Sequence, residues 1–131
     1  MRTPQIIFGT GLVVLVVLLL TPQRHPPRYD TAAEMTLHGV VQDVRNFYCP
    51  ISGDEGTHLT VATDGGTVEV HVAPARFLNG QKWQFFRGDE VEVVGSRIIY
   101  HGHEALIART IARGNQTVAV RKADGKPLWA E

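Results

Sequence analysis

The order of apolar and polar residues divides the chain into two parts. The first part contains an uncharged apolar run from Ile6 to Leu20, with the sequence IIFGTGLVVLVVLLL. From Met35 onward, apolar and polar residues alternate with a period of two and β-branched residues are frequent, a pattern typical of strands. The sequence therefore predicts a β-rich domain behind an apolar segment, and its first strand covers Met35 to Phe47.

The strongest local signal is a β-hairpin in the segment HLTVATDGGTVEVHV, residues 58–72. Asp64 and Gly65 form a dipeptide that supplies positive φ in two-residue hairpin turns. Alternation on both sides of this turn predicts the cross-strand pairs Val61 with Val68, Leu59 with Val70, Thr60 with Glu69, and His58 with His71. The first two pairs share one face, which we expect to be core, and the last two share the other, which we expect to face solvent.

The second half of the domain contains one interruption. Pro74 breaks the alternation, and the aromatic-rich segment APARFLNGQKWQFF predicts a brief helix and a packed loop. Alternation resumes after a turn at Gly88 and Asp89, and Gly95 inside this strand indicates a bulge or sharp bend. A short extra hairpin from Thr117 to Arg121 would end the chain, with Trp129 as a stopper.

Three strands, a helix and two further strands are the element order of an oligonucleotide/oligosaccharide-binding (OB) barrel. The predicted fold is mainly β: a five-stranded OB-fold-like barrel with a short helix between strands 3 and 4, preceded by an N-terminal transmembrane helix. We expect residues 1–21 to be a membrane anchor or signal segment, residues 22–34 a Pro-rich stalk, and residues 35–131 the barrel domain.

The length of the apolar run does not decide between anchor and signal peptide. Its residues cover ~22 Å of a hydrocarbon layer ~30 Å thick. Leu18 and Leu20 stand where signal peptidase needs small residues, which favours an uncleaved anchor over a cleaved signal. Basic residues flank the run on both sides, so their distribution gives little indication of which end lies in the cytoplasm. We expect a single pass through the cytoplasmic membrane, with the domain facing the periplasm or exterior.

Composition and motifs narrow the function. The 13 Lys and Arg balance 13 Asp and Glu, so no global field attracts nucleic acid, and binding to nucleic acid is not expected. The single cysteine, Cys49, excludes an intramolecular disulfide and a multi-cysteine metal site. The sequence contains no nucleophile elbow, phosphate-binding glycine loop or HExxH motif. We therefore expect a non-catalytic protein without a cofactor.

Four segments carry a family resemblance: HLTVATDGGTVEVHVAP, GDEVEVVGSRI, ALIARTIARG and DGKPLW. They resemble the hairpin, bulged strand, final strand and tail of small bacterial exported OB-fold proteins, some of which carry the name of a magnetosome protein. The resemblance implies the barrel architecture and an extracytoplasmic setting, with no established reaction.

The layout is also similar to that of the periplasmic haem chaperone of cytochrome c maturation, an anchored OB barrel. In that family the final strand is followed by a haem-attaching histidine and then a tyrosine. The corresponding stretch here, ARGNQTVAVRKADG, contains neither residue, so haem transfer is not expected.

Three residues form a candidate metal site. If the hairpin register is right, His58 and His71 are neighbours, and Cys49 lies one loop away. Imidazole and thiolate are ligands that suit copper or zinc. We expect the two histidines to be adjacent but metal-free, with a metal-handling protein as an alternative function.

A local basic strip is the other candidate surface. Arg97, Arg109, Arg113 and Arg121 fall on the last strands and could gather on one side for a ligand or partner. Such a strip would suit a single-stranded nucleic acid or oligosaccharide binder, a further alternative. The expected function is a binding or interaction module of the cell envelope, whose partner is another envelope protein.

Overall fold

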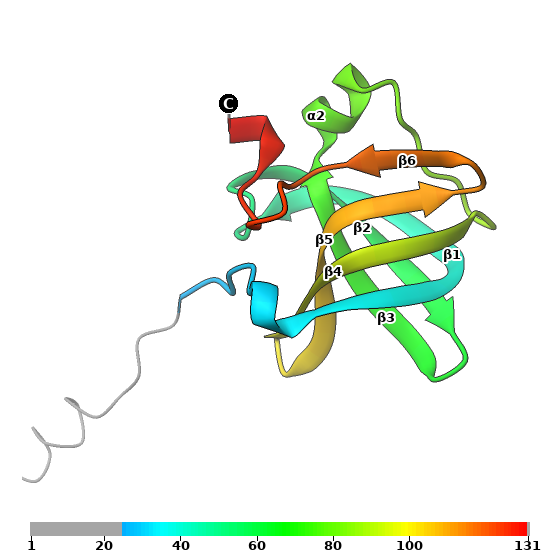
Figure 1. The fold of residues 1–131 in the computed structure, drawn as a ribbon, viewed down its shortest axis with the longest axis horizontal. Coiled ribbons are helices and arrows are strands. Elements are labelled where there is room, and N and C mark those ends of the chain that lie inside the picture. Colours follow the sequence, from blue (N-terminus) through cyan, green and yellow to red (C-terminus); the bar gives the residue numbers. More distant parts are fainter. Residues whose placement is uncertain (1–24, 131) are drawn as a thin grey trace, which may run out of the picture.

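A computed structural model of the protein describes residues 25–130, and six strands and one short α-helix make up this part of the chain. The elements are β1 (Glu34–Cys49), β2 (Asp54–Thr63), β3 (Gly66–Pro74), α2 (Ala75–Gly80), β4 (Glu90–Tyr100), β5 (His103–Arg113) and β6 (Gln116–Ala119). Short 3-10 turns at Thr31–Ala33 and Leu128–Ala130 flank them (Figure 1). The predicted helix after the third strand is therefore present.

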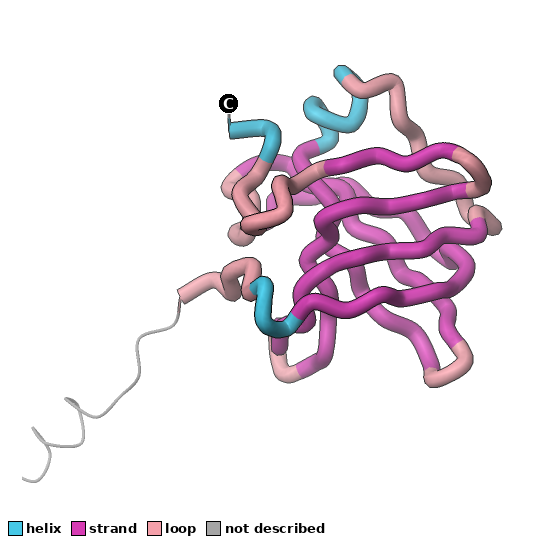
Figure 2. The backbone as a smooth tube through the Cα atoms, in the orientation of Figure 1, coloured by secondary structure: helices cyan, strands magenta, loops and turns pink. Residues whose placement is uncertain are grey.

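The strands close into a barrel. Antiparallel pairing joins β1 to both β2 and β4, β2 to β3, and β4 to β5. Parallel pairing of β3 with β5, from Glu69 opposite Ala105 to His71 opposite Ile107, then joins the two ends of the sheet. This topology is that of an OB barrel, as predicted. The additional strand β6 pairs with β5 and extends the sheet at its rim (Figure 2).

The predicted hairpin register is confirmed, but the turn differs from the expectation. Val61 pairs with Val68, Leu59 with Val70, Thr60 with Glu69, and His58 with His71. Positive φ falls on Gly66, at 120°, and not on Asp64 or Gly65. The side chain of Thr63 stabilises this turn, since its hydroxyl donates to the Gly66 carbonyl (2.7 Å) and accepts from the Gly65 amide (3.2 Å). A side chain would therefore be strained at Gly66 and not at Gly65.

Two apolar clusters hold the barrel. The main cluster fills the interior and includes Leu59, Val61, Val70, Val93 and Ile111, with α2 and the following loop closing one end through Leu78 and Phe85. The second cluster lies on the opposite face of the sheet. Its buried members are Ile98, Ala105 and Ile107, and its partly buried neighbours are Tyr29, Ile51 and Tyr100. Where the second cluster lies, both faces of the sheet are therefore covered by other side chains.

The second cluster overturns the expectation that the His58 and His71 face is exposed to solvent. Their relative exposures are 1% and 3%. The alternation along β2 and β3 identifies which residues share a face, but the segments that cover this face come from elsewhere in the chain. The loop after β1 contributes Ile51, and the C-terminal tail contributes Arg121 and Trp129.

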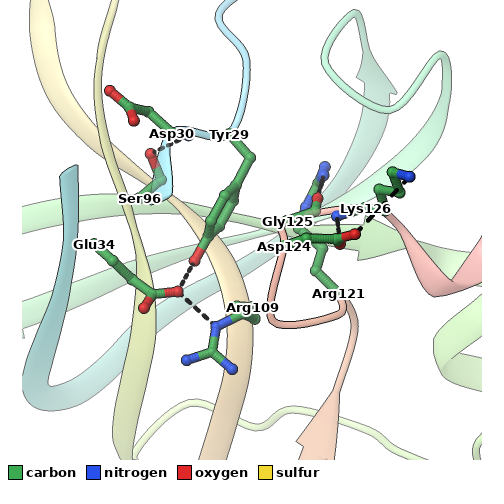
Figure 3. Close-up of polar contacts among 9 residues, drawn as sticks. All are labelled: Tyr29, Asp30, Glu34, Ser96, Arg109, Arg121, Asp124, Gly125 and Lys126. Atoms are coloured by element: carbon green, nitrogen blue, oxygen red, sulfur yellow. Dashed lines mark hydrogen bonds and ion pairs between the residues drawn. The ribbon is translucent and has the colours of Figure 1, made fainter. Parts of the chain in front are cut away.

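The segment before β1 is fastened to the barrel. The Asp30 amide donates to Ser96 Oγ (3.0 Å), and Tyr29 and Arg109 both donate to Glu34 Oε1, at 2.5 and 2.6 Å (Figure 3). Residues 29–33, which the sequence assigns to the stalk, thus contact the domain. Within residues 25–130, no helix has the length and apolar character needed to cross a bilayer. The predicted anchor, Ile6 to Leu20, lies outside the described residues.

Candidate metal centre

Three strands bring Cys49, His58 and His71 together under the second apolar cluster. Cys49 is the last residue of β1, His58 lies in β2, and His71 is its partner in β3. One ligand atom from each, the cysteine sulfur and one nitrogen of each imidazole, lie within 4.8 Å of one another, and all three residues are buried. The structure therefore brings together the three residues that the sequence predicts as a candidate metal site, and their binding of a metal stays a prediction.

His58 is held in a tautomer that suits a metal ligand. Its Nδ1 lies 3.1 Å from the Gly56 carbonyl oxygen, which can only accept a hydrogen bond, so Nδ1 carries the proton. The other nitrogen, Nε2, is then a free lone pair, and it is buried without a hydrogen-bond partner among the described residues. Phe47 stacks on the ring at a centroid distance of 3.8 Å and fixes its plane.

His71 lies between Cys49 and an acidic residue. Its Nδ1 is 3.6 Å from the Cys49 sulfur, and its Nε2 is 4.0 Å from Glu69 Oε1. A proton on Nε2 faces the carboxylate and leaves the Nδ1 lone pair directed at the sulfur side. Tyr100 contacts the ring edge-on, with centroids 4.7 Å apart. At 4.0 Å Glu69 is too distant for a hydrogen bond, and Nε2 of His71, like that of His58, is buried without a hydrogen-bond partner among the described residues.

Burial keeps both imidazoles neutral. Desolvation lowers the pKa of His58 to about 4, with a smaller contribution from the nearby Arg45 charge, although the bond to Gly56 acts in the opposite direction. Desolvation likewise lowers the pKa of His71 to about 4, and His58 and His101 reinforce the shift. Neutral imidazole is the form that binds metal, so no proton competes for these sites at neutral pH.

The spacing fits one small metal ion. With metal–sulfur bonds of about 2.3 Å and metal–nitrogen bonds of about 2.0 Å, two ligands of a trigonal or tetrahedral ion lie roughly 3.5 to 3.8 Å apart. The sulfur to His71 Nδ1 distance of 3.6 Å falls within that range. The other separations between ligand atoms are at most 4.8 Å, so the three side chains would have to move closer together to hold one ion.

A cysteine beside a histidine is also the beginning of a nucleophilic pair, but the space around this pair is too small for an organic substrate. The cavity that these residues line has a volume of only about 10 Å³. This is at the lower limit for a single water molecule and far below the volume of an organic substrate. An ion bound directly to the three side chains replaces their mutual contacts and needs no such cavity.

The four arginines nominated as a basic strip do not form a free basic surface. Arg97 pairs with Glu104 (2.5 Å), Arg109 with Glu34 (2.6 Å) and Arg113 with Asp89 (2.9 Å). The fourth, Arg121, is buried and lines the same small cavity as Cys49, His58 and His71. The sequence gives no sign that Arg121 is buried, because it is one of several charged residues near the end of the chain. The only sequence feature that indicated packing of this tail on the barrel was the expected role of Trp129 as a stopper.

The fold and the cluster define an OB barrel with a candidate Cys-His₂ metal centre built outside the barrel interior. Residues 33–118 match the family described as the MamS/MamX magnetosome protein family, and the chain belongs to that family. This agrees with the resemblance drawn from the four sequence segments. No curated protein matches the sequence.

Solved structures of similar fold include the Stn1–Ten1 complex of S. pombe, at 13% identity and a TM-score of 0.50, covering 72% of this chain and 81% of that chain. The mitochondrial single-stranded DNA-binding protein Rim1 of S. cerevisiae is 17% identical with a TM-score of 0.49, covering 63% and 93%. A replication protein A heterotrimer bound to single-stranded DNA is 14% identical with a TM-score of 0.47, covering 75% of each chain. At these identities the likeness concerns the fold alone.

Proposed function

We propose that the protein is a non-catalytic OB-fold module of the cell envelope that binds a soft metal ion, Cu(I) or Zn²⁺, through Cys49, His58 and His71. The observation that carries the proposal is the buried cluster itself, with its ligand atoms within 4.8 Å of one another. The unpartnered, buried Nε2 of His58 supports it, since a buried polar atom without a partner is costly unless a ligand satisfies it.

The chemistry of the three donors favours soft ions. A thiolate and two neutral imidazoles prefer Cu(I) or Zn²⁺ to Mg²⁺ or Ca²⁺, which take oxygen ligands. The burial of all three donors supports tight retention, because a bound ion would be shielded from water. The sequence predicts a binding or interaction module without naming its ligand. We propose that this ligand is a metal ion, or a partner protein that exchanges a metal ion with it.

Titration of the full-length protein with Cu(I) and Zn²⁺, in competition with a chromogenic chelator under anaerobic, reducing conditions, tests this function. We expect one equivalent of metal to bind the wild type. We expect the affinity for the metal to fall at least about a hundredfold in His58→Ala/His71→Ala and in Cys49→Ser, because each change removes side chains that bind the ion directly.

The matched control is His38→Ala/His103→Ala, which removes two exposed histidines and should bind like the wild type. Equal binding by the wild type and the His58→Ala/His71→Ala variant, or no stoichiometric binding by the wild type, would contradict the proposal. Circular dichroism of each variant separates loss of the site from loss of the fold.

We also propose that the run from Ile6 to Leu20 anchors the protein in the cytoplasmic membrane, with the barrel on the outer side and another envelope protein as its partner. The uncharged apolar sequence and the following prolines support this placement. The protein should fractionate with membranes, and protease added to spheroplasts should digest the barrel. Protection of the barrel in intact spheroplasts, with digestion after lysis, would reverse the orientation.

A further inference from the structure

Arg121 lies beside the candidate metal centre and carries a charge that no carboxylate within residues 25–130 neutralises by an ion pair. It is 8% exposed and lines the small cavity together with the three donors. Its Nη1 donates to the Gly125 carbonyl (2.8 Å, Figure 3), and its Nε is buried without a hydrogen-bond partner in the described chain. A guanidinium stays protonated in proteins, so a full positive charge is held here.

The position of this charge is fixed from several sides. The guanidinium carbon lies 4.8 Å from the centre of the Trp129 ring and 5.6 Å from that of the Tyr29 ring. The backbone of Arg121 forms a β-bridge with Pro127, and its amide donates to the Arg109 carbonyl (3.2 Å). The side chain therefore cannot move into solvent without separating the C-terminal tail from the barrel.

We infer that Arg121 makes the Cys49, His58 and His71 site selective for the monovalent ion Cu(I) over Zn²⁺, an inference that rests on the proposed metal site. Cys49 is the only one of the three donors that becomes an anion. Cu(I) with one thiolate and two neutral imidazoles has no net charge, whereas Zn²⁺ with the same ligands keeps one positive charge. Beside the buried Arg121 cation, the divalent complex is repelled and the neutral one is not.

The number of ligands that the site can supply also favours Cu(I) over Zn²⁺. Zn²⁺ in proteins is almost always four-coordinate, and a site with three protein ligands completes its shell with water or substrate. The cavity of about 10 Å³ offers no more than the minimum volume for one water. Glu69 cannot serve as the fourth ligand of an ion bound to Cys49. It faces Nε2 of His71, whereas the sulfur of Cys49 faces Nδ1 of the same ring. A soft ion that accepts three ligands fits this space.

Other charges near the cluster do not offset Arg121. Arg45 lies on the His58 side and Glu69 on the His71 side, and they have opposite signs. Both are in contact with solvent, with side-chain exposures of 55% and 33%. Solvent screens such charges much more strongly than it screens a buried guanidinium.

The test compares the full-length wild type with Arg121→Gln, Arg121→Lys and the matched control Arg97→Gln, which removes an exposed arginine from β4. Affinities for Cu(I) and Zn²⁺ are measured by chelator competition, and the ratio of the two dissociation constants is the readout. Arg121 repels the Zn²⁺ complex, which keeps one positive charge, and does not repel the neutral Cu(I) complex. Arg121→Gln should therefore lower the preference for Cu(I) by about tenfold or more, while Arg121→Lys and Arg97→Gln keep it.

X-ray absorption of the Cu(I)-loaded wild type provides a second measurement that needs no variant to fold. We expect three ligands, one sulfur and two nitrogens. A fourth ligand, a wild-type preference for Zn²⁺, or an unchanged ratio in a folded Arg121→Gln protein would overturn the inference and leave the metal site standing. A wild type that binds neither ion removes the proposed function and this inference together.

Discussion

Replacement of Gly95 by valine is expected to destabilise the barrel by about 4 kcal/mol or more, a large share of the stability of a small domain. Gly95 lies in β4 where the register to β5 shifts, at the bulge that the sequence predicted. A Cβ atom at this position would lie 2.4 Å from the Ile107 carbonyl oxygen and 3.1 Å from Leu106 Cδ2. Because the nearest atom belongs to backbone inside the sheet, relief requires the two strands to separate.

Thermal unfolding of the full-length protein, followed by far-ultraviolet circular dichroism, measures this effect. The matched control is Gly65→Val, the same substitution in the β2–β3 turn, where the nearest atom to an added Cβ is Thr63 Oγ1 at 3.9 Å. The control should unfold within a few degrees of the wild type. A Gly95→Val protein that unfolds at the wild-type temperature would show that β4 and β5 do not approach each other as described.

Local sequence signals predicted the strands and their register because those features depend on neighbouring residues. Alternation determines which side chains share a face, and the turn residues determine how two arms pair. The exact turn could not be read, since Gly65 and Gly66 are adjacent glycines and either can take positive φ. Gly39 in β1 is a second position where only glycine fits, since an added Cβ would lie 2.3 Å from the Ala62 carbonyl oxygen.

The environment of the candidate site could not be predicted in the same way. The sequence shows that His58 and His71 share a face, but burial of that face depends on segments that are distant in the chain. Tyr29 precedes the barrel, and Arg121 and Trp129 follow its last strand. Their packing here results from barrel closure, which no local pattern encodes. The same long-range packing changes Arg121 from an expected surface charge into a buried neighbour of the candidate metal ligands.

Acidification of the metal-free protein is expected to destabilise it between pH 6.5 and pH 4. In the unfolded chain both imidazoles accept protons near their ordinary pKa of 6.5, whereas burial lowers the pKa of each to about 4 in the folded state. The unfolded state therefore binds more protons in this range, and stability rises with pH. The contribution of each neutral histidine is fully present above pH 6.5 and is lost as the pH falls toward 4, up to about 3 kcal/mol for each.

Chemical denaturation of the metal-free, full-length protein at a series of pH values measures how steeply the free energy of unfolding changes with pH. From about pH 4.5 downward, protonation of Glu34 and then of Asp54 adds to the loss, since Arg109 and Arg76 hold the pKa of these carboxyls below their usual values. The His58→Leu/His71→Leu protein should have a much flatter profile from pH 6.5 to 4. The exposed pair His38→Gln/His103→Gln should keep the wild-type slope.

Equal slopes in the wild type and the His58→Leu/His71→Leu variant would mean that the two imidazoles are not held neutral by burial. A further comparison connects this behaviour to the metal site. An ion bound to both imidazoles competes with protons for the same lone pairs, so loading the protein with Cu(I) should move the acid transition to lower pH. The size of this displacement should grow with the concentration of free Cu(I), since only the folded protein assembles the three ligands in one place.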